Sequence, residues 1–441
     1  MKIKNKEVYI VHAVDTEGPL YESKKATIQR IKELTGIKIK ESELKKIFEN
    51  DILKSKNKFL FNKLSKIFSP HLLNYNSNWS SIKKMLDKIS TNKFRNELKD
   101  FNNNGYVLTW HCLDHLNYKT NLRKKVLGHS KIFNFYKNYL KTNKTIKDDI
   151  QFHFHPISIF REGNRNASLF FRNDNIYQIL SRRIIDHCWF PVAHRAGFHI
   201  ERPDANWFLN QFIPFDLSNT NKNMRRSDSP AKNAFGSDWR RAPSNWEIYS
   251  PDENDYQKKG KSRRFIGRVL SIMNRTESID LKEVNKAFKR ANEGKKTLLA
   301  VTSHDFRNLK TEINFFRSLI KKSSKKFPKV KFYFVDTVKG FQKTLSLKNI
   351  KKNSIKLNIK RINKNSFKFN TTNGKVFGPQ PFLAIKLKNG KYIHDNFDFG
   401  LKANEWFYTF CEDTVNLDKV KVIAVAASDS LGNFDVKKYN L

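Results

Sequence analysis

Four short polar clusters in this chain each follow, or interrupt the end of, a run of apolar residues. They are Asp15-Thr16-Glu17-Gly18, His153-Phe154-His155-Pro156, His194-Arg195-Ala196-Gly197 and Ser303-His304-Asp305. Carboxylates and imidazoles bind divalent metals and act as general acids and bases, and a guanidinium pairs with a carboxylate. Together the clusters predict one metal-assisted catalytic site.

Asp15 and Glu17 lie two residues apart on what reads as extended backbone. Side chains two apart on a strand point to the same side, so both carboxylates can face one pocket. One carboxylate can then hold a divalent metal while the other acts as a general base on water. The alternative is an acidic turn punctuated by Gly18 and Pro19.

His153 and His155 have the same spacing, which places both imidazoles on one side of a strand in an arrangement suited to chelation. The alternative is a pair of polar residues on an edge strand. Arg195 can orient a catalytic carboxylate or bind an anionic substrate, or it can form a purely structural salt bridge. His304 can act as a general acid near neutral pH, or its ring can be satisfied by a backbone group.

Four other histidines are interpreted as structural or peripheral, outside the metal's first ligands, although His111 and His115 can also line the pocket. They are His111, His115, His194 and His199.

The elements that must position these side chains read as buried strands separated by helical segments. Strands are expected at residues 8–14, 106–112, 150–154, 188–193, 297–302 and 330–335, and helices at, among others, 265–274 and 281–293. This alternation up to about residue 345 predicts a parallel sheet, open or closed into a barrel. Ligands bind at the carboxyl ends of such strands, where the four clusters lie.

The remaining segments predict two insertions and a second domain. Residues 24–100 are polar and helix-rich, and residues 218–262 read as a long loop containing Trp239 and Arg241. After residue 345 the pattern changes to short alternating segments, with Asn389-Gly390 as a hairpin signal. We therefore expect a first domain over residues 1–345 and a small β-rich domain over 346–441.

The formal net charge of +43 has two interpretations. It predicts attraction to anions such as a membrane surface, an acidic glycan or nucleic acid, or it reflects lysine-rich composition spread over solvated faces. The three cysteines are far apart, which excludes a disulfide framework and favours a reducing compartment. The first apolar run is short and ends in Asp15, so the sequence predicts no signal peptide and a cytoplasmic protein, either free in the cytoplasm or peripheral to the inner face of the membrane.

In the type and order of these four clusters, residues 5–345 resemble the polysaccharide deacetylases, the NodB-homology carbohydrate esterases. Asp15-Thr16-Glu17-Gly18 is similar to the first motif of that family in a D-x-E form, and His153-Phe154-His155-Pro156 to the second in a compressed form. Arg195-Ala196-Gly197 and Ser303-His304 are similar to its arginine and terminal histidine motifs. The resemblance implies a distorted (β/α) barrel with a C-terminal all-β domain.

The resemblance also implies a reaction, the hydrolysis of an N-acetyl or similar acyl group from a sugar. Glu17, His153 and His155 would hold a divalent metal, which this donor set suggests is zinc. Asp15 would be the base, His304 the acid and Arg195 a third catalytic residue. Trp239 and Arg241 would contact the sugar. The missing signal peptide favours a lipid-linked or nucleotide-linked glycan precursor, and hence surface polysaccharide or lipopolysaccharide biosynthesis.

Two other functions remain open at this point. The first is a catalytically degenerate deacetylase-fold protein that binds an anionic glycan or a membrane surface. The second is nucleic-acid binding driven by charge, which ranks last because the sequence contains no recognisable nucleic-acid-binding module.

Overall fold

The apolar runs form the strands of one parallel sheet. In the computed structural model, residues 6–21, 23–43, 75–119, 127–143, 147–161, 170, 174–222, 238–273 and 278–441 are described. The strands are β1 Glu7–Thr16, β2 Thr109–Cys112, β3 Asp149–Phe154, β4 Ala193–Ala196, β5 Phe215–Asn219, β6 Phe265–Ser271, β7 Thr297–His304 and β8 Lys331–Phe334.

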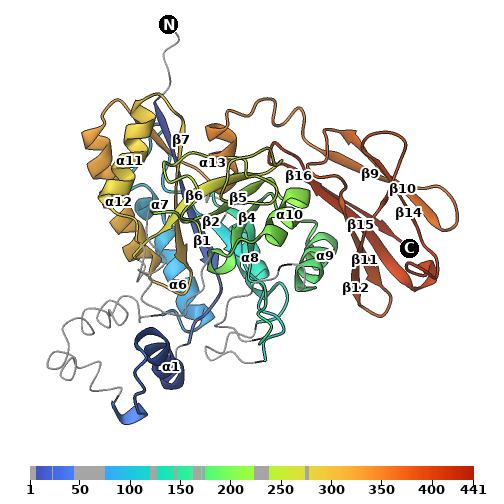
Figure 1. Ribbon diagram of the computed structural model, residues 1–441, viewed down its shortest axis with the longest axis horizontal. Helices are drawn as coiled ribbons and strands as arrows, with labels where there is room; N and C mark the ends of the chain where they lie inside the picture. The colour runs from blue at the N-terminus through green and yellow to red at the C-terminus, as the bar shows by residue number, and fades with distance from the viewer. Residues whose placement is uncertain are drawn as a thin grey trace, which may run out of the picture.

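This sheet closes into a barrel because β1 pairs with β7 on one side and with β2 on the other. The pairing with β2 involves only the carboxyl half of β1, from Ala13 to Thr16. At its amino end, Glu7 to Ile10, β1 pairs with β8 instead. The strand order confirms the predicted parallel α/β barrel, with seven strands in the closed ring and β8 beside β1 (Figure 1).

Helices pack around the barrel, apart from α1 Lys24–Thr35, which lies at the bottom of the view in Figure 1. The others are α6 Trp79–Ile89, α7 Asn92–Arg95, α8 Lys131–Thr142, α9 Asn175–His187, α10 Pro203–Phe212, α11 Leu281–Asn292, α12 Leu309–Lys326 and α13 Thr337–Thr344. Residues 44–74 of the expected helical insertion and 223–237 of the expected long loop lie outside the described residues. No helix in the described ranges has the length and apolar character needed to cross a membrane.

The interior of the barrel has two layers. An apolar layer includes Val11 and Ala13 of β1 and Leu217 of β5, and α13 contributes Val338 and Phe341 to it. The charged residues of the clusters stand at the carboxyl ends of the strands, beyond this apolar layer. The charged residues of the clusters therefore stand on a closely packed apolar layer.

One expected helix is a strand. Residues 265–274 were predicted to be helical, but Phe265–Ser271 forms β6 in the middle of the sheet. Nearly all its residues are buried on both faces, which removes the alternating pattern that identifies a half-exposed strand. Gly267 allows the close packing inside, since a Cβ there would lie 2.9 Å from a methyl carbon of Leu217.

The C-terminal region is a sandwich of two antiparallel sheets, as the alternating segments predicted. One sheet has the order β13-β14-β10-β9 and the other β12-β11-β15-β16. Their bounds are β9 Lys356–Arg361, β10 Ser366–Asn373, β11 Phe382–Leu387, β12 Tyr392–Asp395, β13 Asp398–Phe399, β14 Glu405–Thr409, β15 Val420–Ser428 and β16 Phe434–Asn440. Asn389-Gly390 forms the hairpin between β11 and β12, with Gly390 at φ 84°.

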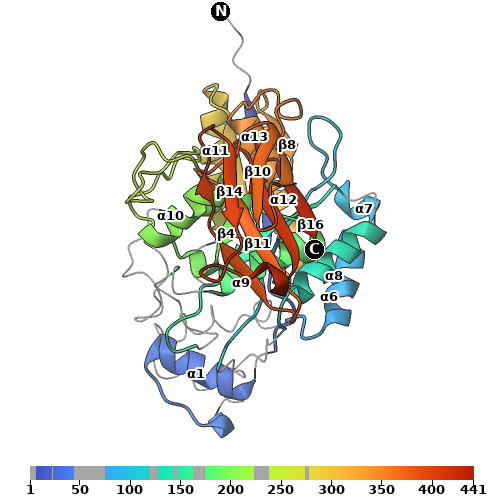
Figure 2. The same cartoon turned by 90° about the vertical axis from the view of Figure 1, so that its right-hand side faces the viewer.

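The sandwich packs against the barrel through one of its sheets. Phe382 of β11 and Tyr392 of β12 share an apolar cluster with Ile184 of α9 and Phe212 of α10. Figure 2 shows the sandwich in front of these helices. The second sheet faces away from the barrel. The sandwich therefore packs against α9 and α10 and contributes no strand to the barrel.

Candidate metal centre

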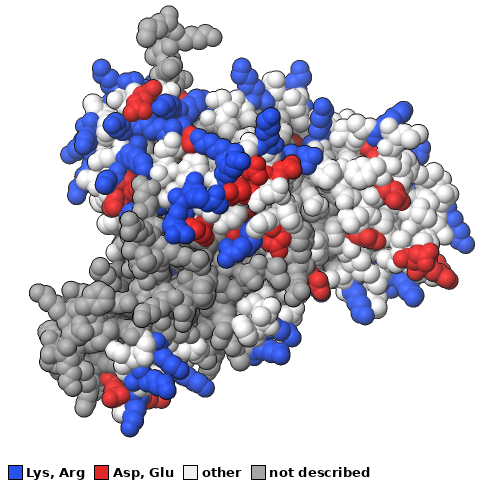
Figure 3. Space-filling view, in the orientation of Figure 1, with Lys and Arg blue, Asp and Glu red and all other residues white. Residues whose placement is uncertain are grey.

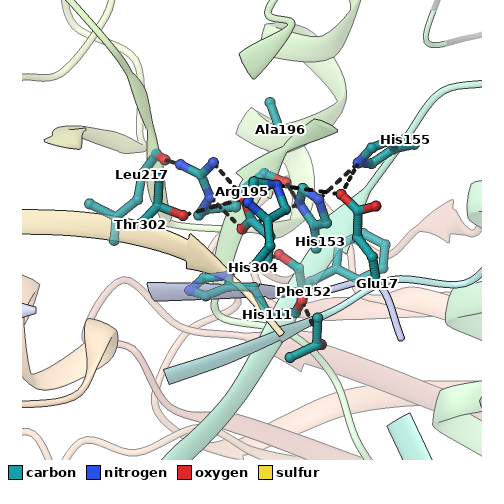
Figure 4. A network of polar contacts seen from close by, with 12 residues as sticks. Glu17, His111, Phe152, His153, His155, Arg195, Ala196, Leu217, Thr302 and His304 are labelled. Carbon is teal, nitrogen blue, oxygen red and sulfur yellow. Dashed lines mark hydrogen bonds and ion pairs between the residues drawn. The ribbon is translucent and has the colours of Figure 1, made fainter. Parts of the chain in front are cut away.

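The four clusters meet at the carboxyl ends of β1, β3, β4 and β7. In the strand register Asp15 lies beside His304, and His153 lies beside Arg195. Glu17 and His155 follow directly after the ends of β1 and β3. Figure 4 shows Glu17, His153, His155 and His304 pointing toward one another, with Arg195 adjacent.

Three of these residues form a group able to hold a metal ion. One ligand atom from each of Glu17, His153 and His155 lies within 4.8 Å of the other two. The Nε2 atoms of the two histidines are 2.9 Å apart. Oε1 of Glu17 is 3.7 Å from Nε2 of His155. Two imidazole nitrogens and a carboxylate oxygen that converge in this way match the three protein ligands of a catalytic zinc site.

The hydrogen bonding of His153 fits metal binding. Its Nδ1 lies 2.8 Å from the backbone oxygen of Arg195, and a carbonyl only accepts, so Nδ1 carries the proton. Nε2 of the neutral ring therefore presents its lone pair to the group. Burial lowers the pKa of His153 well below its usual value, which keeps the ring neutral. Fixing of one ring nitrogen by a backbone carbonyl is the usual way in which a metal-binding histidine is oriented.

Asp15 and Arg195 form a buried, bidentate ion pair. Nε of Arg195 donates to Oδ1 at 2.6 Å and Nη2 donates to Oδ2 at 2.8 Å, while Nη1 donates to the backbone oxygen of Leu217. Burial raises the pKa of Asp15, but the charges of Arg195 and His153 and the hydrogen bonds from Arg195 more than offset this, so the pKa falls below the ordinary value. Asp15 is therefore ionised throughout the physiological range.

His304 joins the two parts of the site. Its Nε2 is 3.6 Å from Oε1 of Glu17 and 4.0 Å from Oδ2 of Asp15. Its side chain is 27% exposed, whereas those of Asp15 and His153 are no more than 3% exposed. His304 is thus the member of the site that a ligand from solvent can reach while still lying beside both carboxylates.

Gly197 follows β4 where the ring of His155 packs on the backbone. A Cβ at position 197 would lie 2.2 Å from Cδ2 of His155 and 2.7 Å from the backbone oxygen of Phe154. The next residue, Phe198, packs against the same ring with 4.7 Å between ring centroids. Phe198 and His199 both have positive φ, at 53° and 56°, a strained conformation for residues other than glycine. This turn fixes the position of the His155 ring.

We expect Gly197→Ala to reduce metal affinity by about 10- to 100-fold, because the added methyl group displaces His155 from the group. Titration of the purified variant with zinc by calorimetry measures this. Gly390→Ala is the control, because that glycine has a positive φ but nothing near its Cβ. It should lose about 1 kcal/mol of stability and keep its metal affinity. Equal zinc affinities for wild type and Gly197→Ala would contradict the expected role of this position.

Asp305 fixes the acidic loop. Its two carboxylate oxygens accept hydrogen bonds from the backbone N–H groups of Glu17 and Gly18, both at 2.9 Å. The hydroxyl of Tyr136 donates to it at 3.0 Å. Asp305 thereby holds the backbone from which the Glu17 side chain projects.

His199 was expected to be peripheral, but it lies beside the ion pair. Its Nδ1 accepts from Nη2 of Arg195 at 3.2 Å, because an arginine can only donate. Burial, followed by the charge of Arg195, lowers its pKa to about 3. The neutral ring thereby adds another contact that holds the guanidinium in place. Only the left-handed turn after β4 brings it there, and nothing in the residue spacing indicates that turn.

Trp239 and Arg241 are placed differently from the expectation that they contact a sugar. Trp239 is 3% exposed, and its Nε1 donates to the backbone oxygen of His199 at 3.0 Å. Its ring is therefore not an open platform, and it supports the turn behind Arg195 instead. Arg241 lies on the surface, where its guanidinium forms a bidentate pair with Asp255.

Two other histidines, His111 and His194, lie outside the metal group. Nδ1 of His111 contacts the backbone oxygen of Phe152, and its Nε2 contacts the hydroxyl of Thr337. His194 points to the other side of β4, where Nδ1 is 3.7 Å from Oδ2 of Asp216.

Comparisons of the chain with known protein families, with curated proteins and with solved structures find no match in any of the three.

Proposed function

We propose that this protein is a metal-dependent hydrolase that removes an N-acetyl or similar acyl group from a sugar, on a barrel of the NodB-homology type. The observation that carries the proposal is the convergence of Glu17, His153 and His155 beside an arginine-bound carboxylate and a partly exposed histidine. This combination supplies a metal site, a permanently ionised carboxylate and a proton donor within a few ångströms of one another. The motif order that resembles the polysaccharide deacetylases supports the same reading.

A divalent ion held by Glu17, His153 and His155, zinc by the chemistry of these donors, would supply Lewis acidity toward an acyl carbonyl and toward water. The side chains themselves provide the proton transfers. Asp15 stays ionised beside Arg195, so it is always in the form that accepts a proton from water. Because the same pairing lowers its proton affinity, it would release that proton readily.

In this proposal His304 delivers a proton to the leaving amine. Its Nε2 lies 4.0 Å from Oδ2 of Asp15, and its ring is the most exposed of the site. A sugar amine that leaves toward solvent passes this imidazole. Arg195 acts on the reaction through Asp15, by fixing the carboxylate with two hydrogen bonds.

The expected substrate is an acetylated precursor, linked to a nucleotide or a lipid, in surface polysaccharide or lipopolysaccharide biosynthesis. The test is release of acetate by zinc-loaded protein, followed by nuclear magnetic resonance. Nucleotide-linked N-acetyl sugars, free N-acetyl sugars and N-acetylated oligosaccharides are supplied separately. We expect release from a precursor and a loss on the order of 10²- to 10⁴-fold in His304→Ala.

Different outcomes separate the parts of this proposal. Release from polymeric glycan alone would contradict the precursor assignment and leave the reaction intact. Zinc binding without acetate release from any of these compounds would contradict the hydrolase assignment and favour a binding protein built on this site. His111→Ala is the matched control, since it removes a buried histidine that lies outside the metal group.

A further inference from the structure

A run of exposed lysines ends beside an exposed aromatic ring at the amino end of β1, away from the metal group. Six lysines between positions 321 and 331 are exposed and have no acidic residue among them in the sequence: Lys321, Lys322, Lys325, Lys326, Lys329 and Lys331. Phe101, with 58% of its surface exposed, lies beside the last of them, Lys331. We call these seven residues the basic face. In Figure 3 blue side chains are frequent over the α11 and α12 side of the molecule, with a few red ones between them.

Phe101 and the lysines are parts of one surface. The backbone N–H of Phe101 donates to the backbone oxygen of Phe332 at 3.1 Å, so the aromatic residue lies alongside β8. Nζ of Lys331 is 4.1 Å from the centroid of its ring. The exposed ring of Phe101 is therefore joined to the strand that directly follows the other lysines in the sequence.

Acidic side chains near this face already have partners. Glu7, which pairs in register with Lys331, accepts from the hydroxyl of Tyr9 at 2.7 Å and lies 3.8 Å from Nζ of Lys296. Asp100 is buried and accepts from the backbone N–H groups of Asn102, Asn104 and Phe334. Glu97 pairs with Arg317 at 2.8 Å. Within the described part of the chain, no ion pair with a carboxylate neutralises the six lysines. The face thus carries a concentrated positive charge that is open to a partner.

We propose that the basic face docks the protein on an anionic lipid bilayer. Lysines near a bilayer are attracted to anionic headgroups, and an exposed aromatic ring among them can enter the interface between headgroups and acyl chains. The cations of this face are all lysines. Arginine, whose planar fork binds phosphates in a bidentate manner, is the residue expected where individual phosphates of a nucleic acid are recognised. This proposal does not depend on the catalytic one.

The test is co-sedimentation of the full chain with vesicles of phosphatidylcholine alone, or of phosphatidylcholine mixed with phosphatidylglycerol. We expect binding to the anionic vesicles only, lost as salt rises from about 0.1 M to about 1 M and the screening length falls from about 10 to about 3 Å. The triple variant Lys325→Glu/Lys326→Glu/Lys329→Glu should bind about 100-fold more weakly, since each lysine near the surface contributes about a fivefold factor. Phe101→Ser should bind several-fold more weakly at every salt concentration.

The matched control is Lys356→Glu/Lys360→Glu/Lys364→Glu, which makes the same change in net charge at exposed positions of the sandwich. It should weaken binding no more than a few-fold. An equal loss in the two triple variants would overturn the proposal, because total charge would then explain the binding. Equal binding of the wild type to neutral and anionic vesicles would also overturn the proposal. So would a basic-face variant that loses binding to duplex DNA but keeps its binding to anionic vesicles.

Discussion

Replacing Arg195 by methionine is expected to destabilise the protein by about 3–5 kcal/mol, because it leaves the buried carboxylate of Asp15 without its partner. The side chains of both residues are almost fully buried, at 1% and 3% exposure, so solvent cannot take over the role of the guanidinium. In the variant the hydroxyl of Thr302, which contacts Oδ2 at 3.3 Å, would remain as a donor to Asp15. Urea unfolding near neutral pH, with a chelator present so that no bound metal contributes, measures the loss.

The loss should depend on pH in a defined direction. In the wild type the pKa of Asp15 lies below its unfolded value, so its stabilising contribution is present above about pH 4 and is lost as the pH falls further. In Arg195→Met burial dominates and the pKa of Asp15 rises above its unfolded value. The folded variant then takes up a proton on acidification before the unfolded chain does, so the stability difference from the wild type should shrink toward pH 4.

Arg195→Lys is the matched control for this prediction. Lysine keeps the charge but cannot bridge both oxygens of Asp15 and also reach Leu217, so we expect a loss of only about 1–2 kcal/mol. The prediction would be contradicted if Arg195→Met and Arg195→Lys lowered the free energy of unfolding equally. It would also be contradicted if the loss in Arg195→Met did not change with pH.

The second large effect is expected on metal content. Wild-type protein incubated with zinc and dialysed should retain about one equivalent, and the double variant His153→Ala/His155→Ala should retain none. Removing two of three protein ligands should lower the affinity by roughly 10⁴-fold. Plasma mass spectrometry of the two proteins, followed by calorimetric titration, measures both quantities.

His111→Ala is the control, because this buried histidine of β2 is not a member of the metal group and both its nitrogens already have partners in the fold. It should bind zinc as the wild type does. Absence of metal from the wild type after reconstitution would exclude the metal centre. Equal retention by the double variant would show that the metal is held elsewhere.

The fold class and the core of the site follow from features that the sequence displays directly. Asp15, His153, Arg195 and His304 each stand at the end of an apolar run, and the carboxyl ends of parallel strands meet at one edge. Their convergence in three dimensions depends on the pairing of β1 with β2. This pairing closes the barrel and places β1 between β7 and β2. The sequence left closure open, because an open sheet produces the same alternation of strands and helices.

What the sequence could not show depends on burial and on local backbone. Trp239 was expected to contact the sugar, but it is buried and forms a small apolar cluster with Tyr249 and Tyr256. His199 reaches Arg195 only through the two positive φ angles after Gly197. The strand at 265–271 was hidden by burial of both its faces. In each case the deciding contact is made with a residue distant in sequence or by an unusual backbone turn.

The length of β1 sets how far from a bilayer the chemistry would take place. Glu7, at its amino end, pairs in register with Lys331 of the basic face, and Asp15, eight residues later, lies in the site. A strand of that length spans up to about 26 Å. With the basic face on a membrane, the site would open toward the aqueous side at about that height. A sugar attached directly to its lipid would remain below it, whereas a longer glycan chain or a freely diffusing nucleotide sugar would reach it.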